Sequence, residues 1–256
     1  MSIRSQWDPG SRDPGIVSCN PSRDLYWPTG CAFAAAFIKK YSNVDVLILN
    51  AGVMISPFEL TEDGLELQIA TNHFGHFLLV KLLEGLMIKS KSRVVVVSSA
   101  AHEGSYSGGI DFASFDNGDN YNPLFAYGQS KLSNVLFSNA LARRLREHGV
   151  ISNSLHPGMI RTELMRHVEF YLKDHFLLKY ITPLTSAVEM LMMDPEMGAL
   201  TQLYAATSPK ISDKFITGKY FDAIAKLKEP HYHATNETLQ DLLWEESERR
   251  TRKFWE

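Results

Sequence analysis

The chain has 256 residues, of which 45% are hydrophobic and 21% charged, and its formal net charge is -3. This length suits one large domain with a sizeable core, and the charge leaves no electrostatic footprint for nucleic acid or an anionic membrane surface. The two cysteines, Cys19 and Cys31, lack zinc-type spacing, so we interpret them as free thiols and expect a cytoplasmic protein. No secretory signal and no apolar run of transmembrane length is visible in the sequence.

The first 30 residues differ in pattern from the rest of the chain. Prolines and glycines recur through residues 1–30 and leave room only for a short strand at Ile16–Cys19. Beyond them, Ala32–Tyr41 predicts a helix, and the apolar run Val44–Leu49 predicts a strand that is buried on both faces. We therefore expect an irregular segment, 1–30, followed by a single domain, 31–256.

The remaining elements alternate between helix and strand. Helical periodicity fills five segments, the first with Thr61 as its expected cap: Glu62–Lys89, Phe125–His148, Thr162–Lys179, Thr185–Thr207 and Thr238–Phe254. Further strands are expected at Arg93–Ser98, Val150–Leu155 and Lys219–Phe221, and a long loop at Ala100–Leu124. This alternation predicts an α/β fold, a doubly wound parallel sheet with right-handed crossovers and helices on both faces.

Three loops follow three of the predicted strands. They are Asn50-Ala51-Gly52, Ser98-Ser99-Ala100 and the segment Pro157–Thr162. Because ligands of open parallel sheets bind at the carboxyl ends of the strands, these loops would face one common site. Their small residues would let the backbone approach a flat ring or a ribose closely.

Tyr127 and Lys131 stand four residues apart on a predicted helix, so they lie on one face. A phenol titrates near ~10, and a neighbouring ammonium favours the phenolate and lowers that pKa. A tyrosine shifted in this way can exchange a proton with an alcohol near neutral pH. This spacing is common on amphipathic helices and is weak evidence by itself. The three loops expected at the same edge of the sheet are what favour a catalytic role for Tyr127 and Lys131.

Several motifs in order along residues 31–250 resemble the short-chain dehydrogenase/reductase family. The resemblance is strongest to its retinol-dehydrogenase-like branch, which includes the catalytic domain of the WW domain-containing oxidoreductase. The motifs are Leu49-Asn50-Ala51-Gly52, Asn72-His73-Phe74-Gly75-His76-Phe77, Val97-Ser98-Ser99, Tyr127-Gly128-Gln129-Ser130-Lys131, His156-Pro157-Gly158 with Thr162, Gly198-Ala199-Leu200-Thr201-Gln202, Thr217-Gly218-Lys219-Tyr220-Phe221 and Leu243-Trp244-Glu245-Glu246-Ser247-Glu248. The resemblance implies a single Rossmann-like domain.

The resemblance also implies a role for each residue of the catalytic set. Tyr127 would be the general acid/base, and Lys131 would lower its pKa and hydrogen-bond the nicotinamide ribose. Ser99 would orient the substrate carbonyl or alcohol, and Asn72 would complete a proton relay through water to Lys131. No metal is needed for this chemistry.

The cofactor implied by the resemblance is NADP or NAD, with NADP favoured by the family alone. Besides Tyr127 and Lys131, the residues expected to contact it fall into two groups. The adenosine and ribose side would be lined by Asn50, Ala51 and Gly52, and the nicotinamide amide and pyrophosphate would be held by Pro157, Gly158, Ile160 and Thr162. The apolar segment Leu164–Leu184 would form a lid, so we expect a small lipophilic substrate. Family members commonly form a homodimer through the helices Glu62–Lys89 and Phe125–His148.

One family feature is missing from the pattern. The glycine-rich turn that binds pyrophosphate after the first strand is not found, and Thr29–Ala36 imitates its spacing with alanines, whose methyls would obstruct the backbone. We prefer to interpret Thr29–Ala36 as part of the helix before Asn50. A βαβ unit needs ~30 residues or more, so we expect the first one to three strands to be missing. Ile16–Cys19 would then be a remnant of the third strand, and Val44–Leu49 an open edge.

Structural explanations compete with the functional ones at several positions. Asn72 could be an ordinary polar helix residue, and Ser98-Ser99 an ordinary turn. His73, His76 and His102 suit packing or satisfied polar positions better than ligand positions. A metal site at His231 and His233 lacks a third ligand nearby.

Two hypotheses about function follow. The first is an NAD(P)-dependent oxidoreductase that interconverts a lipophilic alcohol and its ketone or aldehyde, with Tyr127 as general acid/base. The alternative is an N-terminally truncated, non-catalytic homologue, either a gene fragment or a binding module, that does not bind cofactor. The missing glycine-rich turn motivates the alternative.

Overall fold

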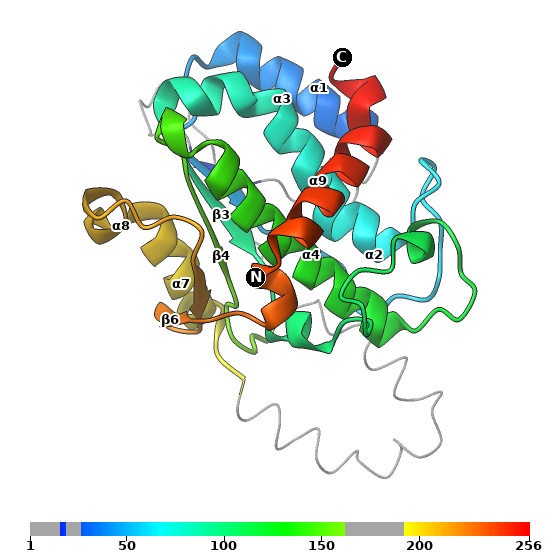
Figure 1. Cartoon of the computed structure of the whole chain (residues 1–256). Helices are drawn as coiled ribbons and strands as arrows, with labels where there is room; N and C mark the ends of the chain where they lie inside the picture. Colours follow the sequence, from blue (N-terminus) through cyan, green and yellow to red (C-terminus); the bar gives the residue numbers. More distant parts are fainter. Residues whose placement is uncertain (1–15, 19–26, 162–191) are drawn as a thin grey trace.

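The computed structural model of the chain describes residues 16–18, 27–161 and 192–256. These residues build one six-stranded sheet with helices on both faces, in which each strand lies beside its neighbours in sequence (Figure 1). The first five strands are parallel and the last is antiparallel to the fifth. This arrangement confirms the predicted fold class. The strands are β1 (Ile16–Ser18), β2 (Val46–Leu49), β3 (Arg93–Val97), β4 (Ile151–Leu155), β5 (Tyr220–Asp222) and β6 (Lys226–Lys228).

The helices pack against the sheet in two layers, with α1, α3 and α4 on one face and α7 and α8 on the other (Figure 1). The α-helices are α1 (Trp27–Lys40), α2 (Leu67–Ile69), α3 (Gly75–Ser90), α4 (Pro123–Arg144), α7 (Pro195–Thr207), α8 (Pro209–Asp213) and α9 (Glu237–Thr251). Shorter helical turns are the π-helical η1 (Ala70–Phe74) and the 3-10 helices η2 (Ala100–Gly104), η3 (Phe112–Phe115), η4 (Arg146–His148), η7 (Tyr232–Thr235) and η8 (Arg252–Phe254).

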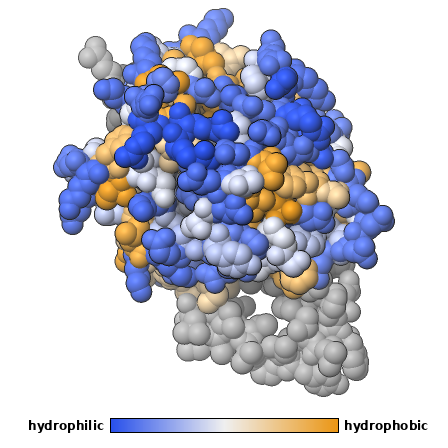
Figure 2. All heavy atoms as spheres, viewed as in Figure 1, coloured by the Kyte–Doolittle hydropathy of each residue, from blue (hydrophilic) through white to orange (hydrophobic). Residues whose placement is uncertain are grey.

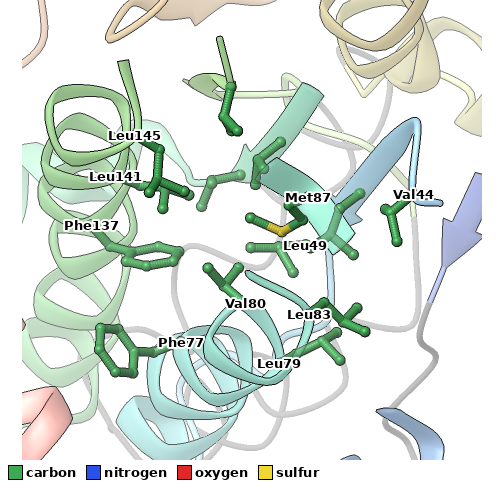
Figure 3. Close-up of a cluster of buried hydrophobic side chains, with 14 of the residues drawn as sticks. Val44, Leu49, Phe77, Leu79, Val80, Leu83, Met87, Phe137, Leu141 and Leu145 are labelled. Carbon is green, nitrogen blue, oxygen red and sulfur yellow. The ribbon is translucent and has the colours of Figure 1, made fainter. Parts of the chain in front are cut away.

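The core is made where the apolar strands meet these helices. The four β-branched valines of β3 alternate between the two faces of the sheet, so Val94 and Val96 lie in one cluster and Val95 lies in another on the opposite face. Figure 3 shows the first cluster, in which side chains from α3 and α4 converge on the sheet. Both faces of β3 are buried, and β2 has Leu47 and Leu49 buried on one face and Val46 and Ile48 partly buried on the other, which explains why both strands are continuous apolar runs rather than alternating ones.

The edge of the sheet beside β2 differs from our expectation. Ile16–Ser18 pairs in parallel with Val46–Ile48, so β2 is not an open edge. By position, β1 stands where the first strand of the 3-2-1-4-5-6 order belongs, and the interpretation as a remnant of the third strand is wrong. Pairing satisfies the backbone groups of β2 that would otherwise be exposed. The described residues add no strand beyond β1.

The helix predicted at Glu62–Lys89 begins later than expected, at Leu67, and Glu66 rather than Thr61 is its cap. Thr61 N–H donates to Leu65 O at 2.8 Å, so the residues before Glu66 form a turn instead of a first helical turn. The Glu66 carboxylate accepts the N–H groups of Gln68 and Ile69 at 2.8 Å each, which satisfies donors at the start of the helix.

Other differences are small. The predicted loop Ala100–Leu124 contains two 3-10 helices, and β6 was not predicted because its three exposed residues carry no buried pattern. The predicted helix Thr162–Lys179 lies outside the described residues. Of the predicted helix Thr185–Thr207 only the later part is described, and α7 begins there at Pro195.

Helix α9 lies across α3 and α4. Trp244 packs against Phe77 and Phe137, with ring centroids 5.0 and 5.9 Å away, and Lys81 of α3 pairs with Glu248 of α9 at 3.2 Å. These contacts occupy part of the helix surfaces through which we expected a homodimer to form. A homodimer therefore stays a prediction.

The face of the molecule seen in Figure 2 is mainly hydrophilic, with separate apolar patches. Exposed apolar side chains on α7 include Met197, Leu200 and Leu203. Within the described ranges, no helix combines the length and the apolar character needed to cross a membrane.

Candidate active site

The three loops singled out in the sequence meet at one edge of the sheet. Parallel pairing sets Leu49 beside Val96, and Val97 beside Leu155, so the loops after β2, β3 and β4 leave the same end of adjacent strands. Helix α4 packs against β3 and β4 and brings its first turns to this edge. The predicted convergence of the segments is therefore found in the structure.

Asn72 is fully buried and ties the loop after β2 to helix α4. Its Oδ1 accepts the Val53 N–H at 2.8 Å, while its Nδ2 donates to Val53 O at 2.9 Å and to Ser130 Oγ at 2.8 Å. Asn72 belongs to the π-helical turn η1, and such single turns inside α-helices are frequent at functional sites. Both amide hydrogens of Asn72 are engaged by protein, which leaves its place in a proton relay a prediction.

Gly52 lies directly over the pair formed by Asn72 and Lys131. A Cβ atom at Gly52 would stand 3.1 Å from Asn72 Oδ1 and 3.3 Å from Lys131 Nζ. Three of the predicted site residues, from the loop after β2, from η1 and from α4, thus lie close together. A side chain at position 52 would crowd the Lys131 ammonium, so the small residue keeps that side of the lysine accessible.

Tyr127 and Lys131 are both buried on α4, with 6% and 4% of their surface exposed. Lys131 Nζ lies 5.7 Å from the centroid of the Tyr127 ring and donates a long hydrogen bond, 3.4 Å, to Val97 O. Burial lowers the pKa of Lys131 to about 8. It also raises the pKa of Tyr127 to about 12, and a hydrogen bond between the Ser99 and Tyr127 side chains only partly offsets that rise.

The direction of the Tyr127 shift is the opposite of the one expected from the sequence. The spacing of Tyr127 and Lys131 suggested that the ammonium would lower the pKa of the phenol. In the structure the loss of solvent around Tyr127 is the main cause of the shift in its pKa, and the charge of Lys131 is not among the causes. Sequence spacing shows which charges are neighbours, but it carries no information about how completely both are desolvated.

The two serines after β3 serve different purposes. Ser98 is buried, and its hydroxyl donates to Lys131 O at 2.7 Å, which fastens the end of β3 to α4. Ser99 caps the 3-10 helix η2, where its Oγ accepts the Ala101 N–H at 3.1 Å. Because that bond uses a lone pair of Ser99, its own hydrogen remains available for the Tyr127 oxygen.

Gly128, which lies between Tyr127 and Lys131 in the sequence motif, sets the distance between α4 and η2. A Cβ atom at Gly128 would contact the carbonyl oxygen of Gly104 and would lie 2.9 Å from Ala101 O. Tyr127 and Ser99 can reach each other because the two backbones touch here. The signal was available, since a glycine inside a long helix costs ~1 kcal/mol relative to alanine and calls for a packing reason.

The loop after β4 is held mainly by the segment before α7. Met193 N–H donates to Met159 O at 2.8 Å, and Arg161 N–H donates to Met193 O at 3.1 Å. Gly158 adopts a φ of +97°, and a Cβ there would meet Met193. The Ile160 side chain packs where a Cβ of Gly198 would be.

The structure describes three of the four predicted cofactor residues of this loop. Pro157, Gly158 and Ile160 stand at the same edge of the sheet as Tyr127. Thr162 lies outside the described residues.

The nicotinamide and ribose half of a dinucleotide fits these residues. The buried Lys131 ammonium has three donors and makes one long hydrogen bond to the described residues, beside a backbone that Gly52 keeps open. Ala51 is buried and Asn50 is exposed on the same loop. The residues that imitate a phosphate-binding turn, 29–36, belong to helix α1, which confirms the interpretation that we preferred.

The histidines behave as buried polar residues. His73 pairs with Ser247 Oγ at 2.8 Å, and burial lowers its pKa and that of His76 to about 3. Both ring nitrogens of His102 are hydrogen-bonded. Over the described part of the chain, no three side chains of His, Cys, Asp or Glu gather as a metal site would require, around His231 and His233 or elsewhere.

Comparisons with known proteins agree with this geometry. The family model for short chain dehydrogenases matches residues 31–170. Human retinol dehydrogenase 13 is 42% identical over 219 residues, which are 85% of this chain and 63% of that protein. The chicken WW domain-containing oxidoreductase is 40% identical over 228 residues, 86% of this chain and 52% of that protein. The chain thus spans between half and two thirds of the length of these relatives.

A solved structure extends the agreement to three dimensions. The crystal structure of an uncharacterised protein from Mycobacterium paratuberculosis superposes with a TM-score of 0.64 at 29% sequence identity, covering 89% of this chain and 73% of that one. The match of family model, curated relatives and fold includes the segments that carry Asn72, Ser99, Tyr127 and Lys131. The chain belongs to the short-chain dehydrogenase family.

Proposed function

We propose that this chain is the catalytic part of an NAD(P)-dependent oxidoreductase that interconverts a lipophilic alcohol and its ketone or aldehyde. The observation that carries the proposal is that Asn72 Oδ1 and Lys131 Nζ meet beside Gly52, where an added Cβ atom would lie 3.1 and 3.3 Å from them, next to the hydrogen bond between Ser99 and Tyr127. Four segments far apart in the sequence supply these groups. Each residue type has a use in moving a proton to or from an alcohol oxygen.

In this proposal Tyr127 exchanges the proton with the substrate oxygen. Its pKa of about 12 makes the phenol a proton donor at neutral pH, which suits reduction of a carbonyl. When substrate binds, the single hydroxyl hydrogen of Ser99 turns from the Tyr127 oxygen to the substrate oxygen and fixes its position. Lys131 holds positive charge close to Tyr127 and stabilises the phenolate left after the proton has moved.

The nicotinamide cofactor, when bound, supplies or accepts the hydride. The residues proposed to hold it are Lys131 at the ribose, with Asn50, Ala51 and Gly52 on one side and Pro157, Gly158, Ile160 and Thr162 on the other. NADP rather than NAD is the cofactor that family resemblance favours. The lipophilic substrate, the cytoplasmic location and a homodimer are further parts of the proposal, and the name of human retinol dehydrogenase 13 supports only the first of them.

A second candidate function is a binding module that does not use cofactor. It is favoured by the helical conformation of residues 29–36, which provide no glycine-rich turn. The first experiment separates the two candidates. The purified chain is titrated with NADPH and with NADH, and binding is followed by cofactor fluorescence. Binding in the micromolar range supports the oxidoreductase, whereas a folded protein that binds neither cofactor at millimolar concentration supports the binding module.

Turnover then tests the role of Tyr127. Retinaldehyde and a long-chain aliphatic aldehyde serve as probes, and oxidation of NADPH is followed by absorbance. Tyr127→Phe removes the exchangeable proton, and we expect kcat to fall by about 10²- to 10⁴-fold, the usual contribution of a general acid. The matched control is Tyr41→Phe, at the far end of β2 from the site. Equal kcat for wild type and Tyr127→Phe would refute the assignment.

A further inference from the structure

His102 occupies a place in the site that the proposed mechanism leaves unused. It lies in η2, three residues after Ser99, and none of its surface is exposed. Its Nδ1 is 2.7 Å from Ser99 O, and its Nε2 is 3.1 Å from the backbone nitrogen of His231. The ring therefore spans from the active-site serine to the segment between β6 and η7.

The partners of the ring fix its tautomer. The backbone N–H of His231 can only donate, so Nε2 of His102 must accept and carries no hydrogen. The hydrogen of the neutral ring then sits on Nδ1 and is donated to Ser99 O. Protonation of Nε2 would set two donors against each other and break the bond to His231.

The surroundings of His102 keep the ring neutral. Burial is the main cause that lowers its pKa, and the positive charge of Lys228 on β6 acts in the same direction. Glu103 on η2 opposes the shift, while His231 favours it. His156, which follows β4, also faces His102, and the Tyr220 ring of β5 packs against it with centroids 4.9 Å apart.

We propose that His102 is a positioning residue, which holds Ser99 in place for the substrate oxygen through the hydrogen bond from its Nδ1–H to the Ser99 carbonyl. This inference rests on the proposed function of Ser99 and Tyr127 and adds a residue to which that function assigns no role. His102 also donates its backbone N–H to the same carbonyl at 3.1 Å, so one residue supplies both donors. Through His231, the hold on Ser99 extends to the segment after β6.

Two substitutions separate the two hydrogen bonds of the ring. In His102→Asn the side-chain amide nitrogen can take the place of Nδ1, so donation to Ser99 O is kept and the bond from His231 is lost. In His102→Gln the longer side chain can place its oxygen near the former Nε2, so the bond from His231 is kept and that to Ser99 is lost. Each variant loses one buried hydrogen bond, and we expect similar losses of stability in urea unfolding.

The two variants should differ in kcat even though their losses of stability are similar. Loosening Ser99 should lower kcat of His102→Gln by about 10- to 100-fold with little change in KM for NADPH, because misplacement of a positioning group acts on the chemical step. His102→Asn should keep kcat within a few-fold of wild type. His148→Gln, at an exposed position in η4, is the control for a histidine outside the site. Equal kcat losses in His102→Asn and His102→Gln would overturn the proposal.

A spectroscopic measurement makes the test independent of turnover. Nitrogen-15 NMR of the histidine rings, with His102 identified by its loss in His102→Gln, reports which nitrogen carries the hydrogen. We expect the Nδ1–H form at neutral pH, persisting below pH ~6.5, the ordinary pKa of histidine. An Nε2–H ring, or protonation at an ordinary pKa, would refute the positioning role even if the chain turned over both probes. The expected tautomer in a chain without turnover would support the geometry at His102 and count against the proposed function alone.

Discussion

The two sides of the candidate site are built by different means. Around β3 and α4, the segments are joined by hydrogen bonds from polar side chains to backbone carbonyl groups, as from Ser98 to Lys131 and from Asn72 to Val53. Around the loop after β4, apolar side chains fill the gaps, as Ile160 does beside Gly198. A backbone carbonyl in a helix cannot move to make room for an added methyl group, whereas the end of a long side chain can change its rotamer. We therefore expect the first side to tolerate substitution far less than the second.

The largest effect is expected for Gly128→Ala. The added methyl would meet the carbonyl oxygens of Gly104 and Ala101, so η2 would have to move away from α4. We expect unfolding to become easier by about 2–4 kcal/mol, in the range of severe overpacking. Because Ser99 caps η2, kcat for the aldehyde probes should fall by about 10²-fold or more. Urea unfolding and steady-state kinetics measure the two effects.

Gly85→Ala is the matched control for that substitution. Gly85 is also a helical glycine, exposed on α3, and nothing lies within 4 Å of an added Cβ atom. Helix propensity alone predicts a gain of about 0.5–1 kcal/mol. If Gly128→Ala were as stable as Gly85→Ala, the close approach of α4 and η2 would not be a structural requirement.

Lys131→Met, on the side of the site that hydrogen bonds hold together, should raise the stability of the protein and abolish its activity. Burial lowers the pKa of Lys131 from 10.5 to about 8, so below pH 8 the folded chain bears the cost of a buried ammonium. At ~1.4 kcal/mol for each pKa unit this cost is about 3 kcal/mol. The variant should be more stable than wild type by an amount of that order at pH 7, while turnover is lost.

The stability difference between wild type and Lys131→Met should depend on pH in a defined direction. Between pH 8 and 10.5 the unfolded chain binds more protons at Lys131 than the folded chain does, so the free energy of unfolding of the wild type rises with pH. The advantage of Lys131→Met should therefore shrink across this window and vanish near its upper end. Urea unfolding at pH 7, 9 and 10.5 measures it, and an advantage that stays constant with pH would contradict the cause.

The sequence was most informative where one physical pattern dominated. The valines of Arg93–Val97 predicted a strand buried on both faces, and the spacing of Tyr127 and Lys131 predicted their common face. Both rest on periodicity, which a single sequence displays. The start of the helix was misplaced because Thr61 is a preferred cap residue and Glu66 is not, and only the turn formed by residues 61–65 excludes Thr61.

What the sequence could not supply depends on contacts between distant segments. The pairing of Ile16–Ser18 with β2 cannot be read from the sequence, because a three-residue strand fits several positions in a sheet. The rise in the pKa of Tyr127 reflects burial by neighbours from other elements. The hydrogen bond between His231 and His102 joins residues 129 positions apart, and no local sequence pattern predicts it.

The smallest effect is expected for Gly198→Ala, on the apolar side of the site. The new methyl would meet Cδ1 and Cγ1 of Ile160, the outer part of a flexible side chain, and helix α7 gains from replacing a glycine. These contributions oppose each other, so we expect a loss of no more than about 1 kcal/mol. Adding Ile160→Ala removes Cδ1, Cγ1 and Cγ2, the atoms that the new methyl would meet, so Gly198→Ala should cost little in that background, which a double-mutant cycle in urea measures. No trimming of a side chain can rescue Gly128→Ala in this way, because there the obstacle is backbone. A loss for Gly198→Ala as large as that for Gly128→Ala, with no coupling to Ile160, would show that both sides of the site are equally rigid.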